Sequence, residues 1–195
     1  MREFIYYSKR AVTEGKYIGK NLMHAGRMDI VCNFVIQSLF ISNDMRKDVK
    51  IHLVFDGQPD PTKHLELFPG EDLKGEIEIS KKDIAGLIKR MLYKYKEGRK
   101  NKIVDGYYVE KKSLIKVIDE MIEEGKQIYI LDKKGEDIRN VELNDDAVFL
   151  IGDHDGLPKK EMKSLKKKIN SISVGPNNLF ASQVVVLINN EVDRR

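Results

Sequence analysis

The chain has 195 residues, of which 41% are hydrophobic and 34% are charged, and its 35 basic and 31 acidic side chains give a formal net charge of +4. This length and apolar content fit a single domain, residues 1–195, with a sizeable core, and the small net charge excludes a polycation that binds nucleic acid by overall charge alone. One cysteine, Cys32, excludes an internal disulfide, and neither a signal peptide nor a membrane-length apolar run is present, so we expect a cytoplasmic protein with no membrane anchor.

The N-terminal part reads as strands alternating with helices. An apolar run predicts an edge or first strand at 3–7, and apolar residues at helical spacing predict a helix at 27–39. The stretch between them, 9–26, is polar and rich in glycine, and it is too long to be a plain linker. A second strand is expected at 49–55, where the turn residues of 56–61 end it.

The middle of the chain gives clear signals for a helix and weak ones around it. A short strand is expected at 76–79. Ser80, with Asp83 three residues later, predicts the N-terminal cap of an apolar helix that ends at Gly98. The basic, glycine-containing stretch 99–108 predicts irregular structure.

The C-terminal part adds a helix and three strands. The helix is expected at 114–125, and the strands at 127–131, 147–151 and 171–174. A hairpin-like turn at 133–137 follows the first of these strands, and a lysine-rich helix lies between the last two. Strands that alternate with helices predict an α/β fold, with a mostly parallel sheet and helices on both faces.

Two glycine loops are the first candidates for a ligand site. They are F-L-I-G-D-H-D-G at 149–156 and S-V-G-P-N-N-L-F-A-S-Q at 173–183, and each follows a buried strand. In open α/β sheets, ligands bind beyond the carboxyl ends of the strands. Neither loop holds a dinucleotide fingerprint or a P-loop. Backbone and apolar groups would therefore have to bind the ligand, and such groups suit an adenosyl group without phosphate. The alternative is that both loops are plain turns.

These loops, with G-R-M-D at 26–29 and M-R-K-D at 45–48, resemble the archaeal tRNA pseudouridine N1-methyltransferases, the TrmY-type branch of the SPOUT superfamily. The resemblance covers nearly the whole chain. It implies a SPOUT fold with a C-terminal trefoil knot, expected within 127–190, and S-adenosylmethionine as cofactor. It also implies methylation of N1 of the T-loop pseudouridine in tRNA by a homodimer, to which the apolar stretch 179–188 would contribute a shared helix.

The resemblance also implies which residues form the cofactor pocket. Leu131 follows the strand that enters the knot, Gly152 lets the backbone approach the ligand, and the loop after the last strand forms the wall. Relatives often carry cysteine at the position of Val184, so this chain lacks any contact made by that thiol. The residues carried over are Leu131, Gly152, Ser173, Val174, Gly175, Pro176, Asn177, Asn178, Leu179 and Val184. Leu131 is equally well explained, without the resemblance, by core packing.

The chemistry asks for a base or a cation near the acceptor ring. N1 of pseudouridine carries a proton, and it becomes nucleophilic as that proton leaves or as negative charge on the ring is stabilised. The candidates are Asp29 with Arg27, Arg46 with Asp48, and Asp153 with His154. We favour Asp29 as the acceptor of the proton or of a hydrogen bond, with Arg27 on a carbonyl or phosphate. The alternative is an aspartate that stabilises the helix dipole, beside a surface arginine.

Two basic clusters are candidates for RNA contact. Six lysines crowd the segment 159–168, and five basic residues in 94–102 lie near four tyrosines, Tyr93, Tyr95, Tyr107 and Tyr108. Lysines bind phosphates and tyrosines stack on unpaired bases. The alternative for the lysine-rich segment is an ordinary solvated surface.

Other functions stay open at this point. Four histidines and one cysteine match no metal-ligand spacing, so no metal is expected. Within the methyltransferases, the alternative substrate is a ribosomal RNA pseudouridine, as in the sister Nep1-type branch. A different class of function is a non-catalytic RNA-binding or adenosine-binding module on the same fold.

Overall fold

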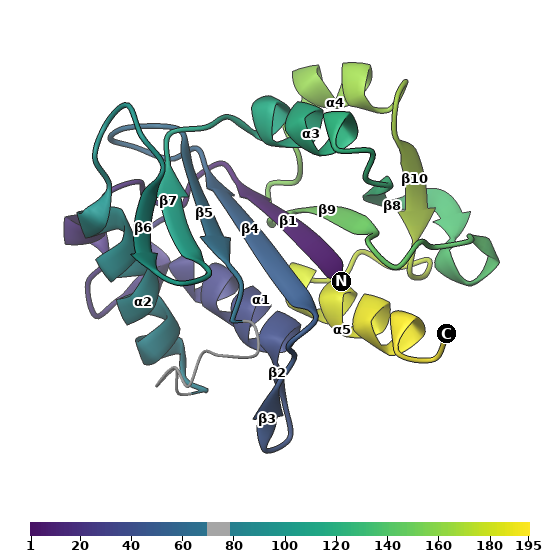
Figure 1. The fold of residues 1–195 in the computed structure, drawn as a ribbon, viewed down its shortest axis with the longest axis horizontal. Helices are drawn as coiled ribbons and strands as arrows, with labels where there is room; N and C mark the ends of the chain where they lie inside the picture. Colours follow the sequence, from purple (N-terminus) through teal and green to yellow (C-terminus); the bar gives the residue numbers. More distant parts are fainter. Residues whose placement is uncertain (70–78) are drawn as a thin grey trace.

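The computed structural model describes residues 1–69 and 79–195. An eight-stranded sheet runs through this part of the molecule in the order β10-β8-β9-β1-β4-β5-β7-β6 (Figure 1). In that order the strands are Asn170–Ser173, Ile128–Asp137, Val148–Gly152, Arg2–Ser8, Val49–Phe55, Lys63–Leu67, Tyr107–Glu110 and Asn101–Val104. The pairings from β10 to β4 are parallel and those from β4 to β6 are antiparallel, which confirms the mostly parallel sheet.

Helices cover both faces of the sheet, as predicted. On one face lie α1 (Met28–Leu39), α2 (Lys81–Lys94) and α5 (Ala181–Val192), and on the other lie α3 (Leu114–Glu123) and α4 (Lys159–Leu165) (Figure 1). The remaining described elements are short: η1 (Gly15–Tyr17), η2 (Leu22–His24), η3 (Ile138–Asn140), β2 (Phe40–Ile41) and β3 (Asp44–Met45). Within the described ranges, no helix has the length and apolar character needed to cross a bilayer.

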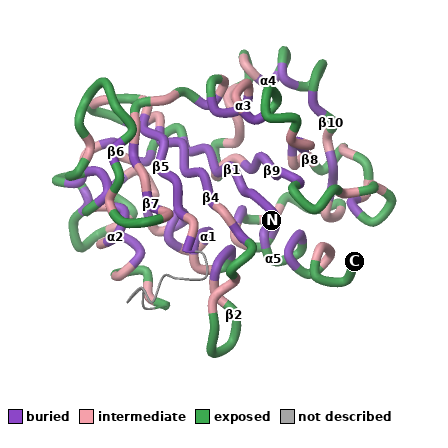
Figure 2. The backbone as a smooth tube through the Cα atoms, in the orientation of Figure 1, coloured by how far each residue is buried: buried purple, intermediate pink, exposed green. Residues whose placement is uncertain are grey.

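The first strand, β1, lies in the middle of the sheet and is buried along its whole length (Figure 2). Its side chains alternate between the two faces. Phe4 and Tyr6 pack into the core under α1, α2 and α5, and Ile5 and Tyr7 pack into the core under α3 and α4. A strand buried on both faces needs a continuous apolar run, and this explains the sequence of β1.

Most predicted elements are confirmed at nearly the predicted positions. The strand at 49–55 matches β4, and α1 begins at Met28, one residue after its predicted start. The predicted cap of α2 is present, because the Ser80 hydroxyl accepts a hydrogen bond from the Asp83 backbone N–H at 3.2 Å. The strand expected at 76–79 falls, except for its last residue, outside the described ranges.

Three features differ from the prediction. The stretch 99–108 is not irregular; it forms most of the hairpin of β6 and β7, whose two-residue turn holds Gly106 at a φ of 79°. Residues 133–137 are not a hairpin turn but the end of the long strand β8. A Cβ atom on Gly135 would lie 2.6 Å from the backbone of β10, so the approach of these two strands requires glycine there. The third is β5, which the sequence pattern does not indicate.

Candidate functional site

Two adjoining cavities lie where β9 and β10 end, beside the middle of β8. One has a volume of about 560 Å³ and the other of about 490 Å³. The residues that line both are Leu131, Asp132, Asp153, Gly156, Leu179, Ala181 and Val184. Both volumes fall in the range of small-molecule sites, and their position beyond the strand ends is the one expected for an α/β sheet.

Nine of the ten residues predicted for the cofactor pocket line these cavities. The larger cavity is lined by Leu131, Ser173, Val174, Gly175, Asn177, Asn178, Leu179 and Val184, and Gly152 lines the smaller one. Pro176 is not among the lining residues of either cavity. The structure therefore brings together residues from the middle of β8, from the ends of β9 and β10 and from α5.

The loop that joins β10 to α5 forms one wall. It turns at Gly175, whose φ of 146° favours glycine, and the Ser173 hydroxyl fixes the turn by accepting a hydrogen bond from the Gly175 N–H at 3.1 Å. The Gln183 side chain then accepts a hydrogen bond from the Phe180 N–H at 2.9 Å and caps α5. The N-terminal end of α5 is thereby held against the cavity.

The loop after β9 forms the opposite wall and is tied to β1. A Cβ atom on Gly152 would lie 2.7 Å from the backbone of Gly156, so this glycine is needed for the loop to fold back on itself. The Asp153 carboxylate accepts hydrogen bonds from the Ser8 hydroxyl at 2.7 Å and from the Asp155 N–H at 2.8 Å. Asp153 is therefore a fixed negative charge on the cavity wall.

Several lining residues are missing from the sequence prediction. Asp132 and Lys133 directly follow the predicted strand at 127–131, and that position at a strand end was the available signal. Asp132 forms an ion pair with Lys166 of the segment after α4, and this hydrogen bond lowers the pKa of the Asp132 carboxyl. Ile30, Ile172 and Ala181 carry no such signal, because they have the pattern of ordinary core residues.

Arg27 and Asp29 form a two-pronged ion pair at the start of α1. The Nε and an Nη atom of Arg27 each donate to a different oxygen of Asp29, both at 3.0 Å. These hydrogen bonds lower the pKa of Asp29, so its carboxylate stays ionised. Neither side chain is fully buried, with exposed fractions of 35% and 21%. The pair thus keeps a donor and an acceptor accessible to a ligand.

The backbone at this pair is unusual. Arg27 has a φ of 62°, a left-handed conformation that is strained for a residue with a Cβ and that clusters at functional sites. Gly26 before it is needed because a Cβ there would lie 1.7 Å from the carbonyl oxygen of Arg10. Ile30, the residue after Asp29, lines the larger cavity. Neither Arg27 nor Asp29 itself lines either cavity.

Tyr6 links this pair to the cavity loop. Burial raises the pKa of the Tyr6 hydroxyl above its ordinary value, and the charges of Asp153 and Asp29 raise it further. The carboxylates of two segments far apart in the chain thus act on the same tyrosine of β1. Asp29 and Asp153 are therefore both close enough to Tyr6 for their charges to act on it.

The second candidate pair, Arg46 with Asp48, does not form. Arg46 instead makes an ion pair with Asp193 at 2.6 Å, and Asp48 makes one with Arg2 at 2.7 Å. Arg2 also pairs with Asp193, at 2.8 Å. None of these four residues lines either cavity. The M-R-K-D segment ties β1 to the C-terminal end of α5.

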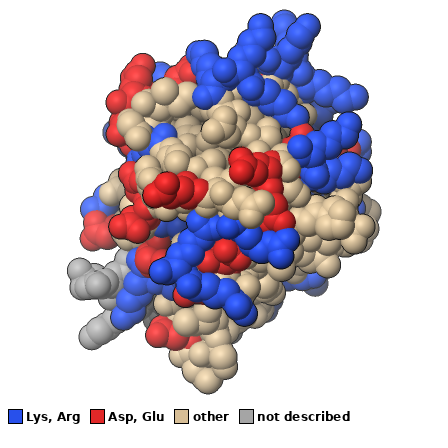
Figure 3. All heavy atoms as spheres, turned by 90° about the vertical axis from the view of Figure 1, so that its right-hand side faces the viewer, with Lys and Arg blue, Asp and Glu red and all other residues tan. Residues whose placement is uncertain are grey.

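The lysine-rich segment borders the smaller cavity, which Lys159, Lys163 and Lys166 help to line. Of its six lysines, only Lys166 forms an ion pair with a residue that the structure describes. Figure 3 shows Lys and Arg side chains gathered over this end of the molecule, around α4. A positive surface is therefore continuous with the cavity.

The tyrosine cluster is not arranged as a stacking platform. Tyr107 is 2% exposed and belongs to the core. Tyr95 and Tyr108 have their rings covered by the amino groups of Lys63 and Lys100, at 4.1 and 4.8 Å from the ring centroids. Tyr93 is 61% exposed. The hypothesis that all four tyrosines stack on RNA bases is therefore wrong for Tyr107.

Two groups of side chains bring together atoms of the kind that bind metals. Among the described residues, they are His52 with His64 and Glu66, and Asp153 with His154 and Asp155. The second group lines the larger cavity, with Asp153 more buried than His154 and Asp155, and Arg10 forms an ion pair with Asp155 at 2.5 Å. That positive charge disfavours a divalent cation there, and the absence of a metal stays a prediction.

The comparisons with known proteins agree on one family. A family model described as "Putative SAM-dependent RNA methyltransferase" matches residues 1–195. The chain is 34% identical, over 197 residues, to the tRNA (pseudouridine(54)-N(1))-methyltransferase of Methanococcoides burtonii, covering 100% of this chain and 96% of that protein. It is 35% identical, over 203 residues, to the protein of the same name from Methanocaldococcus jannaschii, covering 100% and 98%.

A solved structure has the same fold. The crystal structure of Archaeoglobus fulgidus Nep1 bound to S-adenosylhomocysteine superposes with a TM-score of 0.63 at 13% identity, covering 98% of this chain and 97% of that one. At this identity the likeness concerns the fold alone. With the full-length family match, it confirms the SPOUT methyltransferase fold, and the chain belongs to the family of SAM-dependent RNA methyltransferases that includes the archaeal tRNA (pseudouridine(54)-N(1))-methyltransferases.

Proposed function

We propose that this protein transfers a methyl group from S-adenosylmethionine to N1 of pseudouridine at position 54 of tRNA, the reaction for which its relatives are named. One observation carries the proposal: a chain that matches those relatives over its whole length has a cavity of about 560 Å³ between the two loops predicted to hold the cofactor. Ile30, which follows the Arg27–Asp29 pair in the chain, lines this cavity.

The cavity residues fit S-adenosylmethionine. Apolar side chains of Leu131, Leu179 and Val184 suit the adenosyl group, and the carboxylates of Asp132 and Asp153 suit the positive charges of the methionine part. The bound cofactor supplies a methyl group already activated by its sulfonium. What remains for the chain is to hold the acceptor nitrogen in line and to manage its proton.

Arg27 and Asp29 fit the edge of pseudouridine at which N1–H and a carbonyl oxygen are neighbours. A carboxylate has about four acceptor sites and a guanidinium has five donors, so the mutual hydrogen bonds leave both groups with free positions. Asp29 would accept the hydrogen bond of N1–H, and Arg27 would donate to the adjacent carbonyl. Because Arg27 lowers the pKa of Asp29, the aspartate acts mainly by stabilising positive charge on N1 while the proton leaves.

The RNA partner is supported by charge next to the cavity. Five lysines of the segment 159–168 form no ion pair with any described residue, and they are free to contact phosphates. They lie beside the smaller cavity, and we propose that they position the T-loop.

Two further expectations from the resemblance enter here as proposals. We propose that residues 1–195 form one SPOUT domain, in agreement with the extent of the family match. We also propose that the C-terminal part is knotted. Support comes from the way β10, β8 and β9 lie side by side, and from the cavity that β8, β10, α5 and the loop after β9 line together.

We expect the protein to be a homodimer. The outer side of α5 and its N-cap carries exposed apolar side chains, Phe180 at 62%, Val186 at 43% and Leu187 at 39%, and Phe180 also lines the larger cavity. Light scattering at micromolar concentration should give twice the monomer mass for the wild type and the monomer mass for Leu187→Glu. Val104→Glu, on an exposed position of β6, is the matched control and should stay dimeric. A monomeric wild type would contradict the proposal.

The test of the proposed function uses two tRNA transcripts that differ in one base. Labelled methyl should pass to the transcript with pseudouridine at position 54 and not to the one with uridine, whose N1 is glycosylated. Binding of both transcripts without methyl transfer would instead favour a non-catalytic RNA-binding module, and equal labelling of both would exclude N1 as the acceptor.

A further inference from the structure

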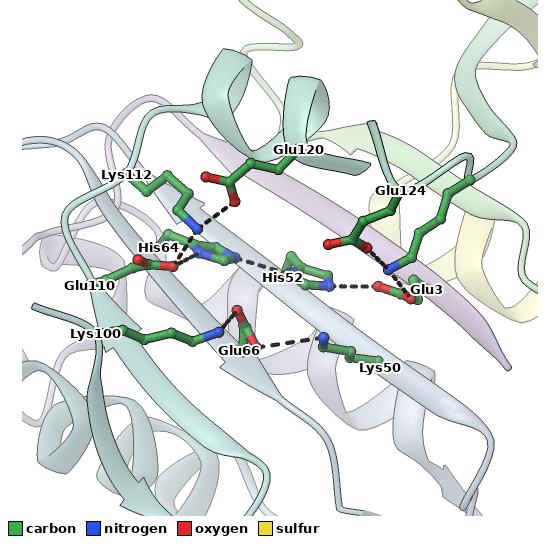
Figure 4. Close-up of polar contacts among 11 residues, drawn as sticks. Glu3, Lys50, His52, His64, Glu66, Lys100, Glu110, Lys112, Glu120 and Glu124 are labelled. Atoms are coloured by element: carbon green, nitrogen blue, oxygen red, sulfur yellow. Dashed lines mark hydrogen bonds and ion pairs between the residues drawn. The ribbon is translucent and has the colours of Figure 1, made fainter. Parts of the chain in front are cut away.

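A row of buried polar side chains crosses the sheet on the face that α3 covers (Figure 4). At its centre are His52 of β4 and His64 of β5, which are 3% and 2% exposed. The Nδ1 atom of His52 lies 2.9 Å from the Nε2 atom of His64. At the two ends, His52 Nε2 lies 2.8 Å from a Glu3 oxygen and His64 Nδ1 lies 3.0 Å from a Glu110 oxygen. None of these residues lines either cavity.

The two imidazole rings meet end to end. The ring planes are 8° apart and the ring centroids are 5.2 Å apart. This centroid distance equals the 2.9 Å between the facing nitrogens plus the radius of each ring. Both nitrogens therefore lie on the line that joins the ring centres, and each points directly at the other. This is the geometry of an N–H···N hydrogen bond.

A metal ion does not fit between these nitrogens. A zinc ion needs about 2.0 Å to each imidazole nitrogen, and on the line between the rings only 2.9 Å is available in total. Glu66, the third residue of this potential metal set, is bound by Lys100 at 2.5 Å and by Lys50 at 3.5 Å. Two ammonium groups beside a carboxylate disfavour a divalent cation. The cluster is better suited to hold a proton.

The hydrogen bonds fix the number of protons. Burial alone would raise the pKa values of Glu3 and Glu110, but hydrogen bonds from the histidines and from lysines lower both to about 2. An ionised carboxylate only accepts, so His52 Nε2 and His64 Nδ1 each carry a hydrogen. A third hydrogen must lie between the rings, since two bare nitrogens at 2.9 Å would otherwise repel each other in a buried place.

We propose that the His52–His64 pair binds three protons on its four ring nitrogens and is therefore a single buried cation held between Glu3 and Glu110. Burial lowers the pKa of His52 to about 4, so His52 accepts and His64 donates in the hydrogen bond between the rings. Protons in such a pair are nevertheless a property of both rings.

Charged side chains from the neighbouring elements surround the pair. They are five carboxylates and four ammonium groups: Glu3, Glu66, Glu110, Glu120, Glu124, Lys50, Lys100, Lys112 and Lys126. Glu120, Glu124 and Lys100 are 41%, 59% and 42% exposed, so water and salt screen their charges. Tyr108 lies against Lys100. The other six groups are more buried and their charges cancel, so the third proton is inferred from the hydrogen-bond geometry between the rings.

The pair joins the two halves of the sheet. Glu3 is on β1, His52 on β4, His64 on β5 and Glu110 on β7, so the row runs from the parallel into the antiparallel strands. If the folded protein holds a proton that the unfolded protein releases, the stability of the folded protein falls as pH rises. The protonated pair therefore stabilises the contact between the two halves of the sheet, and this stabilisation is lost at alkaline pH.

Nitrogen NMR of the wild-type protein tests the proposal without a substitution. At pH 8 an ordinary histidine, with a pKa of about 6.5, is roughly 97% neutral. Two-bond 1H–15N spectra should then show both ring nitrogens of His64 protonated and only Nε2 of His52, with the exposed His24 and His154 as internal references. One proton on each ring would overturn the proposal. So would zinc, added alone, if it shifted both rings.

The pH dependence of unfolding gives a second, independent measurement. Between pH 7.5 and 8.5 the folding equilibrium constant of the wild type should fall about tenfold per pH unit relative to that of His64→Gln. His24→Gln is the matched control and should follow the wild type. Burial raises the pKa of Cys32 to about 12, and its contribution cancels because all three proteins retain this thiol. Parallel curves for wild type and His64→Gln would contradict a bound third proton.

Discussion

Replacing Asp29 by asparagine is expected to lower the turnover of methyl transfer by roughly 10²-fold to 10⁴-fold and to leave the affinity for S-adenosylmethionine unchanged. Asparagine keeps the shape of the side chain but loses the charge that Arg27 holds with two hydrogen bonds at 3.0 Å. Activity of the variant should partly recover at high pH, where N1 loses its proton without help. Initial rates over pH 6–10 measure both effects.

Asp83→Asn is the matched control for this experiment. Asp83 lies in the first turn of α2, as Asp29 lies in the first turn of α1. Neither aspartate lines a cavity, but the residue after Asp29 does and the residue after Asp83 does not. Both substitutions remove a favourable interaction with a helix dipole, which costs about 0.3–1 kcal/mol of stability. Only Asp29→Asn should affect turnover. Equal rates for the two variants would mean that Asp29 only stabilises α1 and has no part in methyl transfer.

Replacing Leu179 by tryptophan is expected to weaken S-adenosylmethionine binding roughly 100-fold, or about 2.7 kcal/mol. Leu179 lines both cavities and is only half-buried, so a larger side chain fills the cavity without disrupting the core. This substitution is more informative than Gly152→Val, because a side chain at Gly152 would displace the cavity loop itself. Titration calorimetry gives the dissociation constant.

Val104→Trp is the control for added bulk. Val104 is 49% exposed on β6 and lines neither cavity, so this variant should bind the cofactor as the wild type does. The midpoint of urea unfolding, measured for both variants, separates a blocked cavity from a damaged fold. Wild-type affinity in a folded Leu179→Trp protein would mean that S-adenosylmethionine does not bind in this cavity.

The sequence predicts the fold well where burial follows a regular pattern. β1 and β4 are buried on both faces and carry apolar runs at 4–7 and 53–55, and α1 repeats apolar residues at helical spacing. β5 is not predicted because three of its residues, Lys63, His64 and Glu66, are polar and yet buried. Their burial depends on partners from other strands, which no local pattern contains.

Two further differences have separate causes. The hairpin of β6 and β7 does have a local signal, the Asp105–Gly106 turn, but the surrounding basic residues resemble a loop. The course of β8 beyond Leu131 is set by contact with β10, which lies about 40 residues later, as the register Ile172 to Glu136 shows. Such a contact has no counterpart in the sequence of either segment.

The candidate site was predictable in its loops and less so in its charges. Glycines mark the two loops, because tight turns and close backbone approach require them, and nine of the ten named residues line the cavities. The ion pair of Arg27 with Asp29 depends on the left-handed backbone at Arg27, which the sequence does not reveal. Asp132 became a candidate only when the cavity was known.

The most direct test of the account is the position of the transferred methyl group. Wild-type protein is incubated with S-adenosylmethionine carrying a deuterated methyl group and a tRNA that contains pseudouridine at position 54, and the nucleosides are separated by mass spectrometry. We expect labelled 1-methylpseudouridine as the product of the wild type, and a greatly reduced amount of it with Asp29→Asn. Label on N3, on a ribose oxygen or on another nucleoside would contradict it.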